Sequence, residues 1–249
     1  MTADFKDRID AGRQLATAVI RLGLVDPLVL ALPRGGVPVA AEVARALHAP
    51  LDLLIVRKIG APGQPELAVA AMAEGEPPTV VIDEHTSLVT EGDHAYIKRE
   101  VRTQRAEIKR RCQAYRRGCA RLGVAGKTVV VVDDGIATGT TVRAALKALR
   151  RMRPSRVVLA VPVASNDTIY ELSQLVDDVV CLSQPGFFGS VGMYYADFHQ
   201  VDDDEVIALL EASRKAPDHE PAARALLGGE VPLVWPSRSD LSEDPTEPR

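Results

Sequence analysis

Two adjacent aspartates, Asp133 and Asp134, directly follow a run of four valines at positions 129–132. The valine run predicts a buried β-strand, so both carboxylates are expected at the end of that strand, where a ligand can reach them. Side chains alternate along an extended chain, so one carboxylate can face the ligand while the other orients the next loop. Ionised carboxylates only accept hydrogen bonds, and a natural partner is a diol, such as the two hydroxyls of a ribose.

The segment from Gly135 to Thr141 has the composition of an anion-binding loop. Gly135 and Gly139 allow the backbone to turn sharply and to approach a ligand closely. Thr138, Thr140 and Thr141 offer hydroxyls, and the free N–H groups at the start of the following predicted helix point to the same place. Together with the two aspartates, this loop predicts a site for a ribose 5-phosphate.

Each feature taken alone has a simpler explanation. An aspartate before a helix can be a cap, and a glycine-containing loop can be only a turn. The combination on one strand–helix unit favours a binding site. The loop lacks the Gly-Lys-Ser/Thr ending of a Walker A loop, and no GxGxxG motif occurs in the chain. Receiver domains also carry two aspartates after a strand, but they have no such threonine loop.

A second candidate anion loop lies near the N-terminus, in LPRGGVPVA at residues 32–40. Gly35 and Gly36 open a predicted helix, which again presents free backbone N–H groups. Arg34 is placed to add positive charge. The alternative interpretation is a tight turn without a ligand.

The elements that must position these loops alternate along the chain. Apolar runs predict short strands, and helical spacing of apolar residues predicts the segments between them. The predicted strands are 28–32, 51–56, 79–82, 128–132, 156–163 and 178–183. The predicted helices are 6–22, 37–48, 93–121, 140–152, 166–175 and 202–215. Residues 66–73 fit either a helix or a strand. This alternation is typical of a parallel sheet covered by helices, whose ligands bind beyond the carboxyl ends of the strands.

The stretch VVVVDDGIATGTT, residues 129–141, resembles the PRPP-binding signature of type I phosphoribosyltransferases. The order of strands and helices from about residue 25 to 200 also fits that family. The resemblance implies an α/β fold with a five-stranded parallel core sheet flanked by helices. It also implies a helical hood insertion at about 84–122, within a domain of residues 1–215. By the same resemblance, Asp133 and Asp134 hold the ribose hydroxyls, and Ala137 to Thr141 hold the 5-phosphate, next to Gly135.

The family also assigns roles to two basic segments. Its first loop contacts pyrophosphate and often carries a strained peptide bond, which implies pyrophosphate binding by Arg34, Gly35 and Gly36. The segment VRKIGAPGQPE, residues 56–66, is similar to the Arg-Lys-x-Gly segment of adenine-type enzymes, which leads into a mobile catalytic loop. Arg57 and Lys58 are therefore expected at the pyrophosphate as catalytic residues. Glu66 is a candidate acid/base on that loop, and equally a surface glutamate.

The base pocket is less well marked in the sequence. In 6-oxopurine enzymes an aspartate precedes the Thr-Gly of the phosphate loop, but here that position is Ala137, which disfavours hypoxanthine and guanine. Residues 184–198 faintly resemble the Val-Gly-Tyr…Asp segment of the same enzymes. Its aromatic side chains could stack on a base or could pack the C-terminal segment, and Asp197 could accept from an exocyclic amine. The candidate base-binding residues are Phe187, Tyr194, Tyr195 and Asp197.

The resemblance implies transfer of phosphoribose from PRPP to a nitrogenous base, with release of pyrophosphate. Mg²⁺ is the implied cofactor and would be held mainly through PRPP, so no protein metal site is expected. The alternative is a regulatory protein of the same fold that senses PRPP or a nucleotide without efficient catalysis. A third interpretation is a hydrolase of phosphoribosylated compounds. The basic helix at 93–121 would belong to the hood or to the interface of a homodimer.

Composition and charge restrict the classes of partner and the cellular compartment that the sequence predicts. The 249 residues carry a formal net charge of −4, which gives no reason to expect nucleic acid or an anionic membrane as partner. No apolar run approaches the ~18 residues that span a bilayer. The charged N-terminus does not resemble a secretory signal, and three cysteines without metal spacing suit reduced thiols in the cytoplasm. Residues 216–249 are rich in Pro, Glu, Asp, Ser and Gly, which predicts a flexible tail, except that VPLVW (231–235) could dock on the domain.

Overall fold

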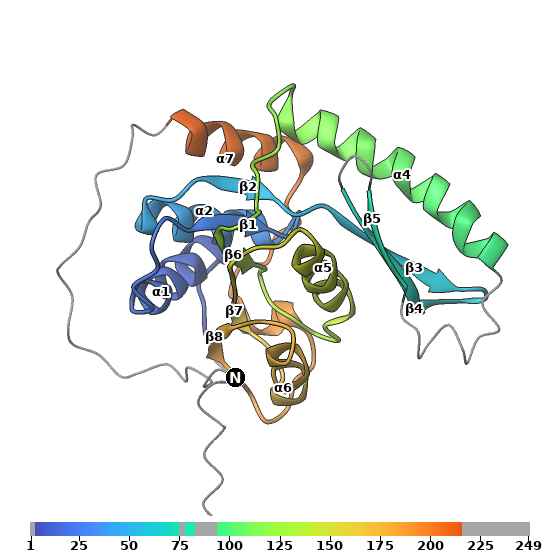
Figure 1. Ribbon diagram of the computed structural model, residues 1–249. Coiled ribbons are helices and arrows are strands. Elements are labelled where there is room, and N and C mark those ends of the chain that lie inside the picture. The colour runs from blue at the N-terminus through green and yellow to red at the C-terminus, as the bar shows by residue number, and fades with distance from the viewer. Residues whose placement is uncertain (1–2, 75–77, 83–93, 216–249) are drawn as a thin grey trace, which may run out of the picture.

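The computed structural model describes residues 3–74, 78–82 and 94–215. They fold around a five-stranded sheet with the strand order β2-β1-β6-β7-β8 (Figure 1). Every neighbouring pair in this sheet is parallel, which confirms the predicted parallel core sheet. Its strands are β1 (Leu28–Ala31), β2 (Leu51–Leu53), β6 (Thr128–Val132), β7 (Arg156–Val163) and β8 (Asp178–Ser183).

Helices cover both faces of the core sheet. Strand β6 is a run of valines because it is buried on both faces of the sheet. Val130 and Val132 belong to the hydrophobic cluster beneath a first group of helices on one face, and Val129 and Val131 belong to the cluster beneath a second group on the other face. A strand buried on both faces needs apolar side chains at every position. The first group is α1 (Arg8–Ile20), α2 (Gly36–Leu47) and α7 (Asp203–Lys215), and the second is α5 (Thr140–Arg151) and α6 (Asn166–Ser173).

A second, smaller sheet lies beside the core and is antiparallel, with the order β3-β4-β5. The long helix α4 packs along it, and α5 of the core also contacts it (Figure 1). We call this unit, β3 to β5 together with α4, the hood. Its elements are β3 (Val56–Ala61), β4 (Gln64–Ala73), β5 (Thr79–Ile82) and α4 (His94–Arg116).

The hood differs from the helical insertion expected at about 84–122. The predicted strand 51–56 is in fact two strands, because β2 ends at Leu53 and β3 begins at Val56. The ambiguous alanine-rich segment 66–73 is part of β4. The run 79–82 is a strand, as predicted, but it pairs with β4 in the hood instead of joining the core. Small alanine side chains set no clear local preference, so pairing with β3 and β5 decides the conformation of β4.

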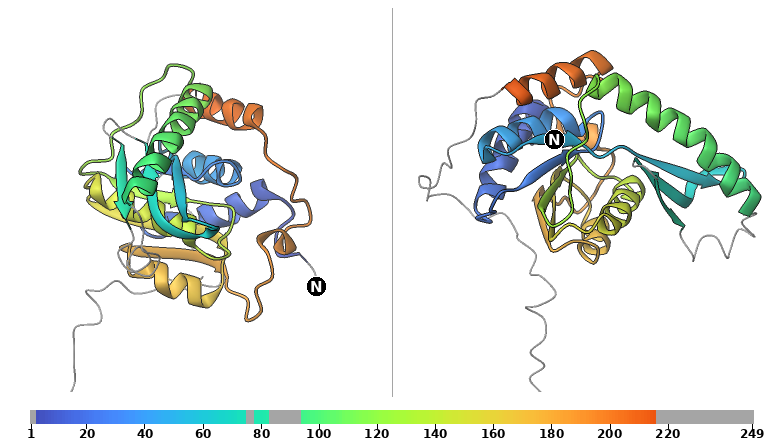
Figure 2. Two further views of the ribbon diagram at one scale, coloured as in Figure 1. Left: turned by 90° about the vertical axis from the view of Figure 1, so that its right-hand side faces the viewer. Right: turned by 45° about the horizontal axis from the view of Figure 1, so that its top comes forward.

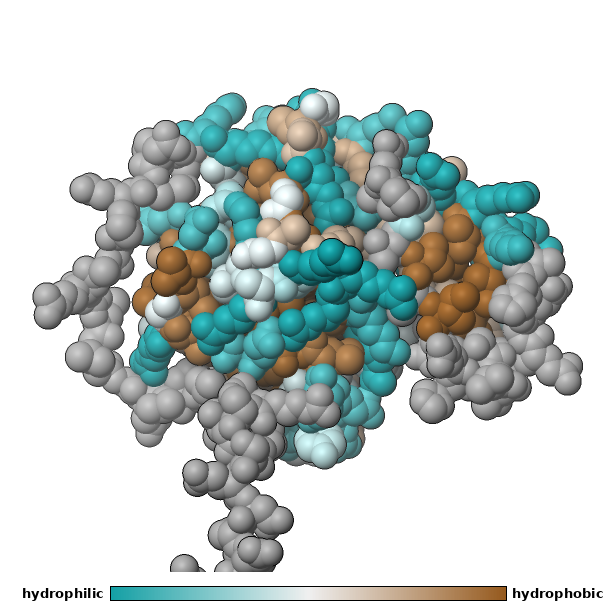
Figure 3. All heavy atoms as spheres, viewed as in Figure 1, coloured by the Kyte–Doolittle hydropathy of each residue, from teal (hydrophilic) through white to brown (hydrophobic). Residues whose placement is uncertain are grey.

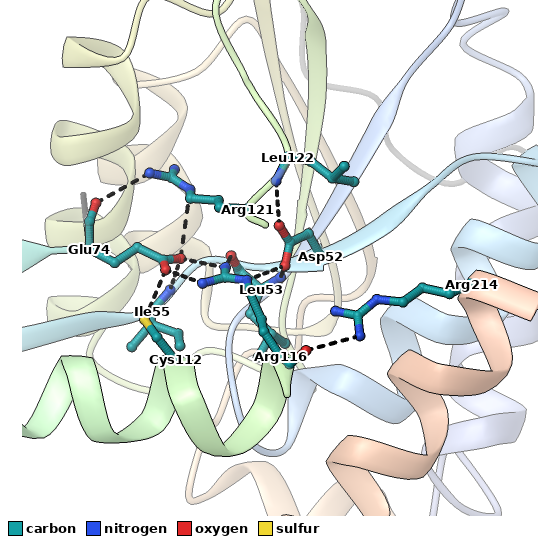
Figure 4. Close-up of polar contacts among 9 residues, drawn as sticks. All are labelled: Asp52, Leu53, Ile55, Glu74, Cys112, Arg116, Arg121, Leu122 and Arg214. Carbon is teal, nitrogen blue, oxygen red and sulfur yellow. Dashed lines mark hydrogen bonds and ion pairs between the residues drawn. The ribbon is translucent and has the colours of Figure 1, made fainter. Parts of the chain in front are cut away.

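A buried cluster of charges joins the hood to the core (Figure 4). Arg116, near the end of α4, donates through Nε to Asp52 Oδ1 of β2 at 2.9 Å and through Nη2 to Glu74 Oε1 at 2.8 Å. Nη2 also donates to the carbonyl oxygen of Leu53 at 3.1 Å, and Glu74 accepts from the Cys112 thiol at 3.1 Å. Burial opposes ionisation of Glu74, but hydrogen bonding and charge from Arg116 and the nearby Arg121 outweigh it and lower its pKa.

Helix α7 lies against the C-terminal half of α4, as both views of Figure 2 show. Tyr115 donates to Asp203 Oδ1 at 2.8 Å, and Arg117 pairs with Glu211 at 3.0 Å. None of the described helices has the length and apolarity needed to cross a membrane. The predicted tail 216–249, with its VPLVW segment, lies outside the described residues.

Candidate functional site

The two aspartates lie at the carboxyl end of β6, in the middle of the core sheet. Both side chains are partly buried, and the backbone N–H of Asp134 donates to Asp133 Oδ1 at 2.9 Å. Burial and the neighbouring carboxylate of Asp134 raise the pKa of Asp133 well above the usual range of an aspartate. The pair presents carboxyl oxygens at the edge where parallel sheets bind ligands.

Arg8 of α1 is a site residue that the sequence analysis missed. Its guanidinium is 6% exposed and donates through Nε to Asp134 Oδ2 at 2.8 Å. It also donates to the carbonyl oxygen of His199 at 2.7 Å and lies 3.9 Å from the centre of the Phe198 ring. Arg8 thus fixes the position of the Asp134 carboxylate. Nothing local in the sequence identifies it, because 126 residues separate it from Asp134.

The predicted phosphate loop leads from β6 into α5. Gly139 is the N-cap of α5 and adopts a left-handed conformation with φ of 69°. A Cβ atom there would lie 2.8 Å from the methyl carbon of Thr168, so both the backbone and the space require glycine. Thr168 also donates to the carbonyl oxygen of Ala137 at 2.9 Å, which fixes the loop against α6.

Hydroxyls gather at the start of α5. Thr138 and Thr140 have their hydroxyl oxygens 3.3 Å apart, and the side chains of Thr138 and Thr141 are exposed. No side chain of the described residues caps the first turn of α5, so its N–H groups are presented to a ligand. This arrangement suits an oxyanion with several oxygens, such as a phosphate.

The second glycine loop packs directly against the two aspartates. Strands β1 and β6 are neighbours, and a Cβ at Gly35 would lie only 2.1 Å from Asp134 Oδ2. A Cβ at Gly36 would lie 2.7 Å from the carbonyl oxygen of Val132. The peptide bond between Pro33 and Arg34 is cis, in the loop where the family resemblance implies an unusual bond. The tertiary structure therefore brings both predicted anion loops together.

A cavity of about 520 Å³ adjoins both loops and the hood. Its walls include Pro33 of the loop between β1 and α2, Thr141 at the start of α5, and Arg57 and Lys58 of β3. Gln104 of α4 also lines it and accepts from Arg57 Nε at 2.9 Å, which orients that guanidinium. The two predicted basic residues thus share one cavity with the start of the phosphate helix.

Arg34 lies at the rim of the site and points toward α7. Its Nη1 is 3.5 Å from Asp203 Oδ1, the same oxygen that accepts from the Tyr115 hydroxyl. Burial and the hydrogen bond to Asp203 raise the pKa of Tyr115. Helices α4 and α7 together therefore position Arg34.

The mobile catalytic loop expected after Lys58 is a β-hairpin in the structure. Strand β3 continues to Ala61, a tight turn contains Gly63 with φ of 74°, and β4 begins at Gln64. Glu66 therefore lies in a strand and not on a loop; its side chain is outside the described residues. Pro62 and Gly63 form the turn of the hairpin, and Gly60 lies at a register shift in the β3–β4 pairing.

The aromatic segment after β8 divides into buried and exposed side chains. Tyr195 is 5% exposed, packs against Phe5 with ring centres 5.4 Å apart, and donates to the backbone oxygen of Asp134 at 2.5 Å. Phe187 is 73% exposed, and its carbonyl oxygen accepts from the Tyr194 hydroxyl at 3.0 Å. Asp197 is exposed and accepts from the backbone N–H of His199 at 3.1 Å. Tyr195 thus fixes the backbone of the aspartate pair through its hydrogen bond to Asp134.

A family profile described as the phosphoribosyl transferase domain matches residues 3–197. The chain belongs to the phosphoribosyl transferase family. This match covers both glycine loops, the aspartate pair, the hood and the aromatic segment of the phosphoribosyl transferase domain. The architecture around these segments, a five-stranded parallel sheet with a hood, agrees with it.

Proteins from two Mycobacterium tuberculosis strains, CDC 1551 and H37Rv, resemble this phosphoribosyl transferase domain. Their names assign them provisionally to the phosphoribosyl transferases, and each is 46% identical over 211 residues. The alignment covers 85% of this chain but 47% of each relative, so the chain spans about half the length of these curated relatives. A crystal structure of a Thermus thermophilus protein is also 46% identical, with a TM-score of 0.76 over 83% of this chain and 97% of that chain.

Proposed function

We propose that this domain transfers phosphoribose from PRPP to a nitrogenous base and releases pyrophosphate. The observation that carries the proposal is the juxtaposition of three features at one sheet edge. These are the aspartate pair, the phosphate loop at the start of α5, and the glycine loop whose Gly35 touches Asp134. Family membership supports the same reaction class.

In this proposal the ribose lies over β6. Asp134, fixed by Arg8 and Tyr195, accepts from one ribose hydroxyl, and Asp133 interacts with the other. The 5-phosphate binds the N–H groups and hydroxyls from Ala137 to Thr141, at the positive end of α5. Binding at both ends of the ribose fixes the orientation of its C1 carbon toward the cavity beneath the hood.

The diphosphate extends from C1 toward the loop of Arg34, Gly35 and Gly36 and toward Arg57 and Lys58. Breaking the C1–O bond leaves positive charge on the sugar and negative charge on the departing diphosphate. The basic side chains stabilise that negative charge, and the nitrogen of the base then forms the new bond to C1. Gln104 keeps Arg57 oriented for this role. Exclusion of water by the hood protects the cationic sugar from hydrolysis.

Mg²⁺ bound to the diphosphate would supply further charge neutralisation. The described residues contain no group of three or more His, Cys, Asp or Glu side chains that could form a metal site of their own. In this proposal Mg²⁺ would be held mainly through PRPP, and Asp133 and Asp134 would remain the acceptors for the ribose hydroxyls.

For the base we propose the aromatic segment after β8. Exposed Phe187 and the neighbouring Tyr194 would stack on it, with Tyr195 as support, and Asp197 would accept from an exocyclic amine. Ala137 leaves the position before Thr138 without a carboxylate, which favours acceptors other than hypoxanthine and guanine. We retain Glu66 as a candidate acid/base on the hairpin.

The test is calorimetric titration with PRPP in the presence and absence of Mg²⁺, followed by a panel of bases and a pyrophosphate assay. Mg²⁺-dependent binding with one base releasing pyrophosphate supports the enzyme and identifies its acceptor. Tight binding without turnover of any base would favour the PRPP-sensing alternative. No binding would overturn the PRPP assignment and point to another phosphorylated ribose.

A paired variant tests the ribose site directly. Asp133→Asn with Asp134→Asn should abolish PRPP binding with little loss of stability, because asparagine still offers Arg8 an acceptor. The matched control is Asp177→Asn with Asp178→Asn, an adjacent aspartate pair at the start of β8 and thus at the opposite end of the parallel sheet. Equal PRPP affinity in the first variant and the parent would show that the ribose site is assigned wrongly.

A further inference from the structure

The hood contains a second concave site, away from the aspartate pair. It is a groove of about 670 Å³ between α4 and the part of the hood sheet where β4 ends and β5 begins. Met72 and Ile108 lie at its base, 0% and 5% exposed, and Pro78 and Ala106 contribute apolar walls. Its size is that of sites that bind small molecules, roughly 300–1,000 Å³.

Three cations of α4 line this groove, namely Arg102, Arg105 and Lys109. Their spacing of three and four residues places them on one face of the helix. All three are exposed, and none has an ion-pair or hydrogen-bond partner within the described part of the chain. Like charges at this spacing repel each other, so an anion bound between them would stabilise this face.

The other arginines of α4 and of its C-terminal end form ion pairs, so the lack of a partner distinguishes the arginines that line the groove from the rest. The paired residues are Arg99 with Glu100, Arg110 and Arg111 with Glu107, Arg116 with Asp52 and Glu74, and Arg117 with Glu211. Lys98 is also exposed and without a partner among the described residues, and its spacing of four residues from Arg102 places it on the same helix face. The cations of α4 that lack partners in the described part of the chain therefore lie on the side of the helix that faces the groove.

Arg121 closes one end of the groove. Its Nη1 donates to the backbone oxygen of Glu74 at 3.2 Å, while its Nε is buried and has no hydrogen-bond partner among the described residues. Glu74 also lines the groove, but its carboxylate is bound by Arg116 and lies 3.8 Å from Arg121 Nε. The groove therefore keeps an excess of positive charge over an apolar base.

Helix α4 packs on the hood sheet through one row of apolar side chains. The groove and the proposed PRPP site lie on opposite sides of that row. Gln104, Glu100 and Arg111 line the 520 Å³ cavity on the β3 side. Arg102, Arg105 and Lys109 line the groove toward β5. Figure 3 shows hydrophilic surface along α4 and an apolar surface beside it over β5.

We propose that this groove binds a small organic phosphate of nucleotide size. The cations would hold the phosphates, and Pro78 and Ala106, which form the apolar walls, would contact the aromatic nucleobase. A phosphate ion alone would leave the apolar walls and floor of the groove uncovered. A long nucleic acid is disfavoured because the site is a short groove on a chain whose formal net charge is −4.

The experiment measures binding of a fluorescent nucleotide, N-methylanthraniloyl-ADP, to the full chain carrying Asp133→Asn and Asp134→Asn. That background removes the proposed ribose site, so nucleotide bound there is excluded. We expect saturable binding that weakens about tenfold or more when Arg102, Arg105 and Lys109 are all changed to glutamine, since charge-assisted contacts are lost.

The matched control changes Arg99, Arg110 and Arg117 to glutamine, which removes the same charge from the same helix region outside the groove. We expect less than about a threefold effect, because these exposed charges are screened. Equal weakening by both triple variants would mean attraction by overall charge and would overturn the proposal. Absence of saturable binding in the Asp133→Asn, Asp134→Asn background would overturn it as well.

A second variant tests the groove without removing a cation. Ala106→Glu places a carboxylate on its exposed wall at a position where glutamate suits a helix, and it should abolish nucleotide binding with an unchanged melting temperature. Unchanged binding in this variant would contradict the proposed location. A twenty-nucleotide oligothymidine that binds in place of the fluorescent nucleotide, with the same sensitivity to the groove variants, would replace the small ligand with a nucleic acid and overturn the proposal.

Discussion

Replacing Arg116 with alanine should destabilise the fold by about 3–5 kcal/mol, because it removes the counter-ion of two buried carboxylates. The side chains of Asp52 and Glu74 are 3% and 4% exposed, so water cannot replace the lost guanidinium. The variant also loses the hydrogen bond from Arg116 to the Leu53 carbonyl oxygen. For a domain of this size, that loss corresponds to a fall in melting temperature of about 6–20 °C.

The measurement is urea denaturation followed by circular dichroism, with Arg117→Ala as control. Arg117 is the next residue, but its side chain is 57% exposed and pairs with a partly exposed Glu211. Its removal should cost less than about 1 kcal/mol. If Arg116→Ala cost no more than Arg117→Ala, the buried cluster would not be what joins the hood to the core.

The pH dependence of the same variant provides an independent check. In the parent chain the pKa of Glu74 is lowered, so its contribution to stability is present at neutral pH and is lost only as pH falls through that lowered pKa. Without Arg116, burial dominates and raises the pKa of Glu74. The carboxyl can then protonate in mildly acidic solution, so the stability difference between variant and parent should narrow as pH falls from 7 to about 5. A constant difference over this range would refute the reasoning.

Other substitutions test the site and the chain ends. Arg8→Gln should weaken PRPP binding about tenfold by releasing Asp134, whereas Arg13→Gln on the exposed side of α1 should not; calorimetry compares the two. Gly139→Ala should lower the free energy of unfolding by more than Gly126→Ala, measured in urea. Both glycines have positive φ, but only at Gly139 does a Cβ meet a neighbour. Deleting residues 216–249 should leave the melting temperature nearly unchanged, and a large drop would indicate that the tail docks on the domain.

The hood shows where sequence reasoning lost accuracy. The amphipathic period over many turns predicts a helix at 93–121, and helix α4 spans His94–Arg116. The hood sheet was not predicted as a sheet. Its strands are short or rich in alanine, and antiparallel pairing between them, which depends on the fold, decides both their conformation and their separation from the core.

The sequence by itself determined the features that are contiguous in the chain. The valine runs determined the core sheet, and the Asp133–Asp134 pair and both glycine loops follow strands that end at one sheet edge, because parallel strands share their direction. Only the tertiary structure decided which distant side chains complete these features. Arg8 reaches Asp134, and Arg116 reaches Asp52 and Glu74, across separations of 42 to 126 residues. Such pairs leave no local periodicity, because their positions depend on how helices pack on the sheet and not on neighbours along the chain.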